Sequence, residues 1–284
     1  MSKVEGRIDF ELLVTVESAN PNGDPLEENR PRMRTNGMGE ISDVCLKRKI
    51  RNRFQDLGYK IFVQMDERSD DGCRSLKARV DSCERLKNAM KGKETDGKEC
   101  AKIACEEWLD VRAFGQVFAF KGTEMSVGVR GPVSIQQALS VSPIEVETLQ
   151  ITKSVNSEDK NGRSSDTMGV KYLVPFGLYV VKGSVSAELA DKTGFTKEDA
   201  GILKTALRTL FEGDSSAAHP AGSMEVRKMY WWEHTSRTPE ATPAEIFRSV
   251  MITPKVAIPE KFEDYEIELK EIKEIKGIVA PEII

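Results

Sequence analysis

Alternating hydrophobic and polar positions mark the first regular element of this 284-residue chain. From Arg7 to Glu17 every second residue is apolar, and Leu13 is the single exception to the alternation. A period of two places such side chains on one face of an extended strand. The pattern therefore predicts a β-strand over residues 7–17 with one buried face.

The next periodic stretch predicts an amphipathic helix. Ser42 is a favourable N-cap residue, and Gly58 can adopt the left-handed conformation that ends a helix. Between them the apolar residues recur at helical spacing: Leu46, Ile50, Phe54 and Leu57. The other side is basic, with Lys47, Arg48 and Arg51 together and with Lys49 and Arg53 flanking the apolar stripe. Alternation returns over residues 59–65, which predicts a second strand.

The remainder of the chain contains two segments that interrupt the regular pattern. Residues 66–102 are charged and rich in turn signals, and we interpret them as an inserted, partly helical lobe. Residues 150–172 are too polar to contribute much to a core, which predicts a projecting hairpin or arm. Strand-like stretches are expected over residues 108–120, 127–135, 173–187 and 226–232. Thr196 and Asp199 resemble a capping box that opens a further helix, with Gly213 as its end.

Without these insertions the order is strand, helix, strand, followed by strand, helix, strand. This order predicts an α+β fold of the split βαβ, ferredoxin-like type that RNA-recognition modules share. We expect residues 1–284 to form one domain, with the lobe at 66–102 and the hairpin at 150–172 as its insertions. The fold class alone implies no function.

The overall charge is mildly acidic, but the charges are unevenly distributed. A net charge of −4 argues against nonspecific nucleic-acid binding by the whole surface. A basic segment nevertheless contains Arg30, Arg32, Arg34, Lys47, Arg48, Lys49, Arg51 and Arg53, and the compensating acidic residues lie near the C-terminus. This asymmetry predicts one face for phosphates and another for solvent or partner subunits.

Other function classes have little support in the composition. The longest apolar runs fall short of a bilayer span, and the N-terminus lacks the apolar region of a secretory signal, so we expect a cytoplasmic protein without a membrane partner. The five cysteines include no close CxxC pair, which favours reduced thiols over a zinc site. With two histidines and no nucleophile motif, we expect no cofactor, no metal and no catalytic activity.

A long loop precedes the basic helix and supports a functional role for this region. Residues 18–41 are rich in Asn, Pro, Gly and Arg, and three prolines oppose regular structure there. Long connections of this kind tend to be functional. A nucleic-acid backbone needs cations and amide donors along a path, so the loop and helix predict a phosphate-binding ledge that includes Asn20 and Asn22. The alternative is a solvated basic helix beside a turn-rich loop.

Several motifs together resemble one family. They are NPNGDP at residues 20–25, DVCLKRKIRN at 43–52, DVRAFG at 110–115, VRGPV at 129–133 and MGVKYLVPFGLY at 168–179. The chain resembles the backbone subunit of the type I-C CRISPR Cascade, a member of the repeat-associated RAMP superfamily. The matching stretches are spread over nearly the whole chain.

This resemblance implies a hand-shaped subunit that binds guide RNA. It would have a modified RNA-recognition-type palm, an inserted finger lobe and a thumb hairpin, and its copies would stack into a helical filament along one guide RNA. Target DNA would pair with the guide bases, and other Cascade subunits would bind at the filament ends and along its side. The resemblance also places Arg112, Phe114, Arg130, Thr152, Lys153, Asn156, Met168 and Lys171 at the RNA.

Two alternatives remain open at this point. Relatives in RNA-targeting complexes use an acidic residue beside the RNA, which would make Asp24 the centre of a metal-dependent ribonuclease. Its Asp-Pro context suits a structural Asx turn, and no His or carboxylate cluster accompanies it in the sequence. The chain could instead be a monomeric RNA-binding module, although the usual aromatic stacking motif is not evident and Trp231 and Trp232 suit a core equally well. His219 lies where a more basic motif is expected, so that loop receives no RNA contact.

Overall fold

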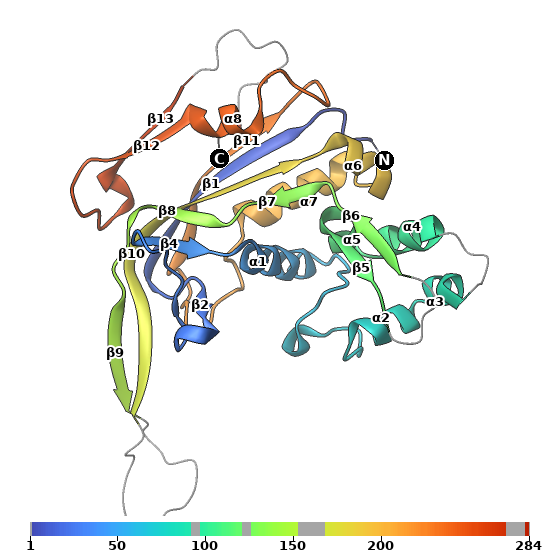
Figure 1. The fold of residues 1–284 in the computed structure, drawn as a ribbon, viewed down its shortest axis with the longest axis horizontal. Helices are drawn as coiled ribbons and strands as arrows, with labels where there is room; N and C mark the ends of the chain where they lie inside the picture. Colours follow the sequence, from blue (N-terminus) through green and yellow to red (C-terminus); the bar gives the residue numbers. More distant parts are fainter. Residues whose placement is uncertain (1, 92–96, 121–125, 153–167, 271–281, 284) are drawn as a thin grey trace, which may run out of the picture.

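An antiparallel sheet forms the centre of the computed structural model, which describes residues 2–91, 97–120, 126–152, 168–270 and 282–283 (Figure 1). The strands lie in the order β14-β11-β1-β10-β8-β4, and β7 and β9 also pair with β10. Their bounds are β1 Ile8–Ala19, β4 Met38–Ile41, β7 Val133–Ile135, β8 Ala138–Pro143, β9 Glu147–Thr152, β10 Met168–Val185, β11 Met224–Glu233 and β14 Glu282–Ile283. The structure is therefore a mixed helix and sheet fold built on one large antiparallel sheet.

Strand β1 is buried on both faces, whereas the sequence predicted one buried face. On one side Phe10 and Leu12 pack with helices α1 (Asp43–Asp56) and α7 (Lys197–Arg208). On the other side Leu13 packs in a second cluster with α8 (Pro243–Ser249) and the hairpin of β12 (Val250–Pro254) and β13 (Tyr265–Leu269). The residue that broke the alternation is thus the apolar contact to the second layer. Trp231 and Trp232 are buried in these two clusters and not available for base stacking.

The acidic residues of β1 are buried under this second layer, and charged or polar side chains lie close to them. Asp9 is fully buried, and its Oδ2 lies 2.9 Å from Arg7 Nε and 2.8 Å from His234 Nε2. Glu11 is also buried, and the closest cation is the Lys182 ammonium at 4.0 Å. Buried charges are tolerated when they are paired or neutralised. A strand with a polar face can therefore lie in the middle of the fold.

Local signals predicted the two main helices well. Ser42 Oγ accepts a hydrogen bond from the Cys45 amide and so caps α1, which Gly58 follows at φ +85°. The capping box of Thr196 and Asp199 is formed at the start of α7. That helix ends at Arg208, before the predicted Gly213. The predicted strand over 173–187 ends at Val185, because Ser186 caps a further helix, α6 (Ala187–Thr193).

One predicted strand is wrong and another is only partly correct. Residues 59–65 form no strand, because the amides of Phe62 and Val63 donate to the Asp110 carboxylate and not to a neighbouring strand. The stretch after Trp108 begins with helix α5 (Leu109–Phe114), and only then continues as β5 (Gly115–Phe118). Strands β7 and β8 occupy the sheet position that residues 59–65 were expected to take.

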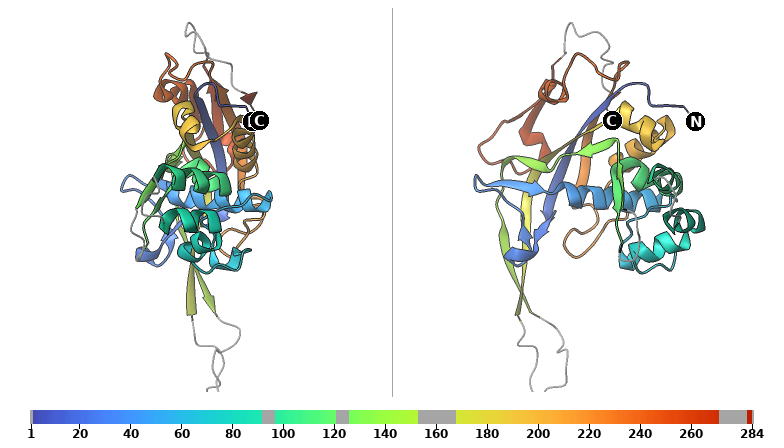
Figure 2. Two further views of the ribbon diagram at one scale, coloured as in Figure 1. Left: turned by 90° about the vertical axis from the view of Figure 1, so that its right-hand side faces the viewer. Right: turned by 45° about the vertical axis from the view of Figure 1, so that its right-hand side comes forward.

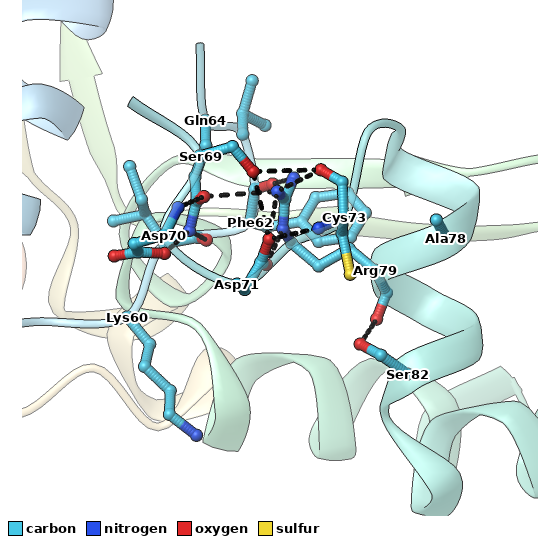
Figure 3. Close-up of polar contacts among 12 residues, drawn as sticks. Lys60, Phe62, Gln64, Ser69, Asp70, Asp71, Cys73, Ala78, Arg79 and Ser82 are labelled. Atoms are coloured by element: carbon cyan, nitrogen blue, oxygen red, sulfur yellow. Dashed lines mark hydrogen bonds and ion pairs between the residues drawn. The ribbon is translucent and has the colours of Figure 1, made fainter. Parts of the chain in front are cut away.

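A smaller lobe with its own core lies beside α1. It contains α2 (Leu76–Ser82), α3 (Glu84–Lys91), α4 (Gly97–Glu107) and the pair of β5 with β6 (Val127–Arg130), and it includes most of the predicted insertion at 66–102. Phe62, Trp108 and Phe118 form its aromatic centre. Figure 3 shows Arg79 at the middle of its polar contacts, where it binds the Phe62 carbonyl at 2.9 Å and the Asp71 carboxylate. The hydrogen bond from Arg79 lowers the pKa of Asp71 to about 2.

The hairpin of β9 and β10 extends away from the body in both views of Figure 2. Strand β10 therefore has two parts, one in the central sheet and one in the hairpin. None of the helices in the described ranges is long and apolar enough to cross a bilayer.

The buried carboxyl of Glu11 predicts an unusual dependence of stability on pH. Burial raises its pKa from 4.5 to about 8, and Lys182 opposes this shift only weakly. The folded state therefore keeps a proton that the unfolded chain loses near its ordinary pKa. The contribution of Glu11 to the free energy of unfolding is fully present below pH 4.5 and is lost as the pH rises through about 8.

We expect Glu11→Gln to flatten this dependence, because a neutral amide replaces the group that must hold a proton. The melting temperature of the variant should exceed that of the wild type by several degrees at pH 8.5 and converge with it at pH 5. Thermal unfolding followed by circular dichroism across this range measures the difference. Glu17→Gln, at an exposed position of the same strand, is the control. Parallel curves for Glu11→Gln and the wild type would contradict the prediction.

Candidate nucleic-acid interface

The predicted loop before α1 is partly regular. Residues 22–32, which we name the ribbon, contain β2 (Gly23–Asp24) paired with β3 (Arg30–Pro31). Glu28 and Asn29 close it with left-handed φ angles of +53° and +64°. A Cβ on Gly23 would lie 2.1 Å from Asn29 Oδ1, so the turn requires glycine there. The ribbon is therefore an ordered element and not the irregular loop that its prolines predicted.

The two asparagines predicted to bind RNA hold the ribbon in place. Asn20 is buried, and its Nδ2 donates to the Asn29 carbonyl at 2.7 Å. Asn22 Oδ1 accepts from the Ser42 amide at 2.9 Å, which fixes the ribbon to the first turn of α1. Both amide side chains thus already have structural partners, and their role at RNA stays a prediction.

Asp24 has a structural role in the ribbon. Its Oδ1 accepts from the Leu26 amide at 3.0 Å and caps a short 3-10 helix (Pro25–Glu27), and its Oδ2 lies 3.1 Å from Arg32 Nη1. Within the described ranges of the chain, no group of three or more His, Cys, Asp or Glu side chains is placed to hold a metal ion. The geometry therefore supports the Asx turn that the sequence suggested.

Most cations of α1 are held by partners inside the chain. Lys49 pairs with Asp214, and Arg51 Nε lies 2.9 Å from Asp110 Oδ2. Arg53 donates hydrogen bonds to Thr209 and Glu212. Arg48 donates to the Val63 carbonyl at 2.8 Å. Burial lowers the pKa of Arg48. Lys47 differs, because among the residues that the structure describes it pairs with Asp43 alone, one turn earlier, and both side chains are partly exposed. Exposed pairs of this kind contribute about 0.3 to 0.5 kcal/mol, so a phosphate can displace Asp43 from Lys47.

The DVRAFG and VRGPV motifs lie where the lobe joins the sheet. Arg112 makes two hydrogen bonds of 2.8 Å to Asp199, the residue that caps α7. Phe114 stacks on Phe54 with ring centroids 6.1 Å apart. Arg130, at the end of β6, is exposed. The first two predicted RNA residues are therefore packed within the fold, while Arg130 is accessible.

The hairpin carries exposed apolar side chains on both faces, Leu149 and Ile151 on one and Val170 on the other. All six residues of β9 are exposed, and the register pairs Leu149 with Lys171 and Ile151 with Gly169. Thr152 pairs with Met168 near the end of the described strands. Lys153 and Asn156, predicted to contact RNA, lie outside the described residues. Leu149 and Ile151, 43% and 52% exposed, share one face because they are two residues apart.

The ribbon contacts the base of the hairpin through Arg30, which the sequence singled out, and through Glu28 and Tyr172, which it did not. The Arg30 guanidinium lies 4.8 Å from the ring centroid of Tyr172, and Tyr172 Oη donates to Glu28 at 2.9 Å. Asp110 and Asp199 were also missed as the partners of Arg51 and Arg112. Only long-range geometry reveals these pairs, since the partners are 59 to 144 residues apart.

The loop after α7 also reaches this region. Its Ala218 carbonyl accepts from the Asn20 amide at 2.8 Å, and His219 Nε2 lies 3.5 Å from Lys49 Nζ. Burial lowers the pKa of His219. The interface is thus assembled from the ribbon, the first turns of α1, the hairpin base and this loop.

Comparison with known proteins identifies the family. The family model described as "CRISPR-associated protein Cas7" matches residues 6–270. The chain belongs to the Cas7 family. A relative from Haloferax volcanii, "CRISPR-associated protein Cas7", is 26% identical over 223 residues, which cover 70% of this chain and 62% of the relative. The match thus spans less than two thirds of the curated relative.

Solved structures of low similarity were also found for this Cas7 chain. A chain of a "CRISPR RNA-guided surveillance complex, pre-nicking" superposes with a TM-score of 0.48 at 16% identity, over 80% of this chain and 78% of the other. A chain of a "CRISPR RNA-guided surveillance complex" gives a TM-score of 0.44 at 18% identity, over 80% and 69%.

We expect Asp110→Asn to destabilise this Cas7 chain by about 2 to 4 kcal/mol, because it leaves the buried Arg51 without an anionic partner. Urea unfolding measures the change. Asp43→Asn removes the exposed partner of Lys47 and should cost less than about 0.5 kcal/mol. Equal effects of the two substitutions would contradict a central role for Asp110.

Proposed function

We propose that this chain is a non-catalytic backbone subunit that binds guide RNA in a CRISPR surveillance complex of type I-C. Its copies line one guide RNA as a filament and leave the bases free to pair with target DNA, in the cytoplasm and beside other Cascade subunits. The observation that carries the proposal is the Cas7 family match over nearly the whole chain. The motifs quoted above support the subtype.

The arrangement of the sheet supports an RNA-recognition-type palm. Strands β11, β1, β10 and β7/β8 are neighbours in this order, and α1 and α7 pack on one side of them. If β7/β8 is counted as the second strand, this is the 4-1-3-2 order of a ferredoxin-like sheet. The exposed hairpin then corresponds to the thumb and the lobe around Phe62 to the fingers.

The distribution of accessible charge supports binding to the RNA backbone. Lys47, Arg30 and Arg130 are exposed or only weakly paired. Partners within the chain hold most of the other predicted cations: Arg32, Arg34, Arg48, Lys49, Arg51, Arg53 and Arg112. A subunit that holds phosphates and leaves sequence reading to base pairing needs few cations per copy, because copies repeat along the RNA. An acidic chain can therefore still bind RNA locally.

The alternative function, a metal-dependent ribonuclease, predicts a different effect of replacing Asp24 on nucleic-acid cleavage. Because both Asp24 oxygens have partners within the ribbon, we expect neither the wild type nor Asp24→Ala to cut RNA or DNA paired to the guide, with or without Mg²⁺. Gel analysis of end-labelled targets measures this. Metal-dependent cutting by the wild type that Asp24→Ala abolishes would favour the ribonuclease.

The proposal is tested by the nucleic acid that the chain carries. We expect the chain, purified with its native complex under low salt, to contain RNA whose sequence combines repeat and spacer. Extraction followed by sequencing identifies it. Random cellular RNA would favour the monomeric RNA-binding module instead, and the absence of RNA would contradict the proposal.

We expect the face of the hairpin that carries Leu149 and Ile151 to contact the neighbouring copy in the filament. Leu149→Asp should then reduce ordered assembly on guide RNA at least tenfold while leaving the melting temperature unchanged, because the side chain has no core contacts to lose. Electron microscopy and sedimentation measure assembly. Val117→Asp places the same charge on an exposed apolar residue of β5, in the small lobe, and is the matched control. Equal loss with both variants, or with neither, would contradict this contact.

A further inference from the structure

The ribbon places one arginine differently from the others. Arg30 is exposed, and its guanidinium lies over the Tyr172 ring at 4.8 Å. Across the described ranges no carboxylate forms an ion pair with Arg30. In contrast, Arg32 and Arg34 in the same segment pair with Asp24 and Glu40 at 3.1 Å each. Arg30 thus keeps its charge and one side of its planar group available.

The support beneath Arg30 is rigid. Tyr172 is nearly buried, at 9% exposure, and its hydroxyl is fixed by the hydrogen bond to Glu28. That bond raises the pKa of Tyr172, so the phenol stays a donor. Glu28 and Asn29 are held by the ribbon turn and by the bond from Asn20. A side chain held in this way loses little conformational entropy when a ligand binds.

Exposed apolar side chains lie on the same two elements as the pair. Leu26, at the turn of the same ribbon, is 94% exposed, and Val170, two residues before Tyr172 on the same face of the hairpin, is 51% exposed. A base that covers such apolar side chains removes them from water, which favours its binding. The surroundings of Arg30 are thus suited to a flat, partly apolar group and not only to a phosphate.

We propose that Arg30, backed by Tyr172, is a stacking platform for one unpaired nucleobase of single-stranded RNA. The assignment rests on the proposed function and adds to it a contact that recognises a base plane, where the other cations contact phosphates. Bases in single-stranded RNA stack on arginine planes and aromatic rings, and such contacts tolerate any sequence because each base has a π-face. A guide with a different spacer in each complex requires this tolerance.

The test distinguishes a contact to a base from a contact to a phosphate. Full-length protein freed of nucleic acid is titrated by fluorescence anisotropy with a labelled oligouridine and with an abasic ribose-phosphate oligomer of the same length and charge. Arg30→Lys keeps the charge but removes the planar group. We expect it to weaken oligouridine binding roughly tenfold and to change abasic binding less than twofold.

Matched variants separate the loss of stacking from other effects of substitution. Arg248→Lys, at an exposed arginine of α8 in the second layer, should leave both ligands bound as in the wild type. Tyr172→Leu should reproduce the loss of Arg30→Lys, while Tyr172→Phe keeps the ring and should stay within twofold of the wild type. Thermal unfolding of each variant checks that the fold is intact.

The outcomes distinguish the platform from the proposed function. Equal weakening of both ligands by Arg30→Lys would overturn the platform in favour of a phosphate contact, and no weakening of either would overturn it outright. In both cases RNA binding by the wild type would leave the proposed function standing. A wild type that binds neither ligand would overturn both.

Discussion

The arrangement of this Cas7 chain depends on the hydrogen bonds that the buried Asp110 carboxylate accepts. This carboxylate accepts hydrogen bonds from the amides of Phe62 and Val63 and from Arg51. A buried carboxylate needs such donors to offset its lost hydration. One side chain thereby joins α1, the segment after it and α5, and it fixes the small lobe against the central sheet. The direction of α1, and with it the position of its first turn, follows from this contact.

The same constraint explains how an acidic chain can offer a basic surface. The arginines that face inward from α1 are neutralised by carboxylates from other elements, so they stabilise the fold without adding to the surface charge. The charge that remains accessible lies at Lys47, at Arg130 and at Arg30 of the ribbon. The ribbon in turn is fixed to α1 through Asn22 and to the hairpin through Tyr172. Separate segments of the chain thus form the face that we propose binds RNA.

The sequence predicted what depends on local signals. Strand β1, helix α1 with its cap at Ser42, the capping box of α7 and the strands β10 and β11 follow from periodicity and capping chemistry. Residues 59–65 alternate like a strand, yet a carboxylate 47 residues away takes their amides. Likewise the basic stripe of α1 was visible, but its pairing with Asp110 and Asp214 required the fold. The role of the motif residues at RNA thus stays a prediction, and their contacts within the fold could not be predicted from the sequence.

The central claim is that RNA lies along the ribbon, the first turn of α1 and the base of the hairpin. Ultraviolet crosslinking of the assembled complex, followed by mass spectrometry of peptide-RNA adducts, tests it most directly. The account predicts adducts on peptides that contain residues 22–34, 43–48 and 168–173. Adducts confined to the small lobe around Phe62 or to the β12–β13 hairpin, with the ribbon unmodified, would contradict it.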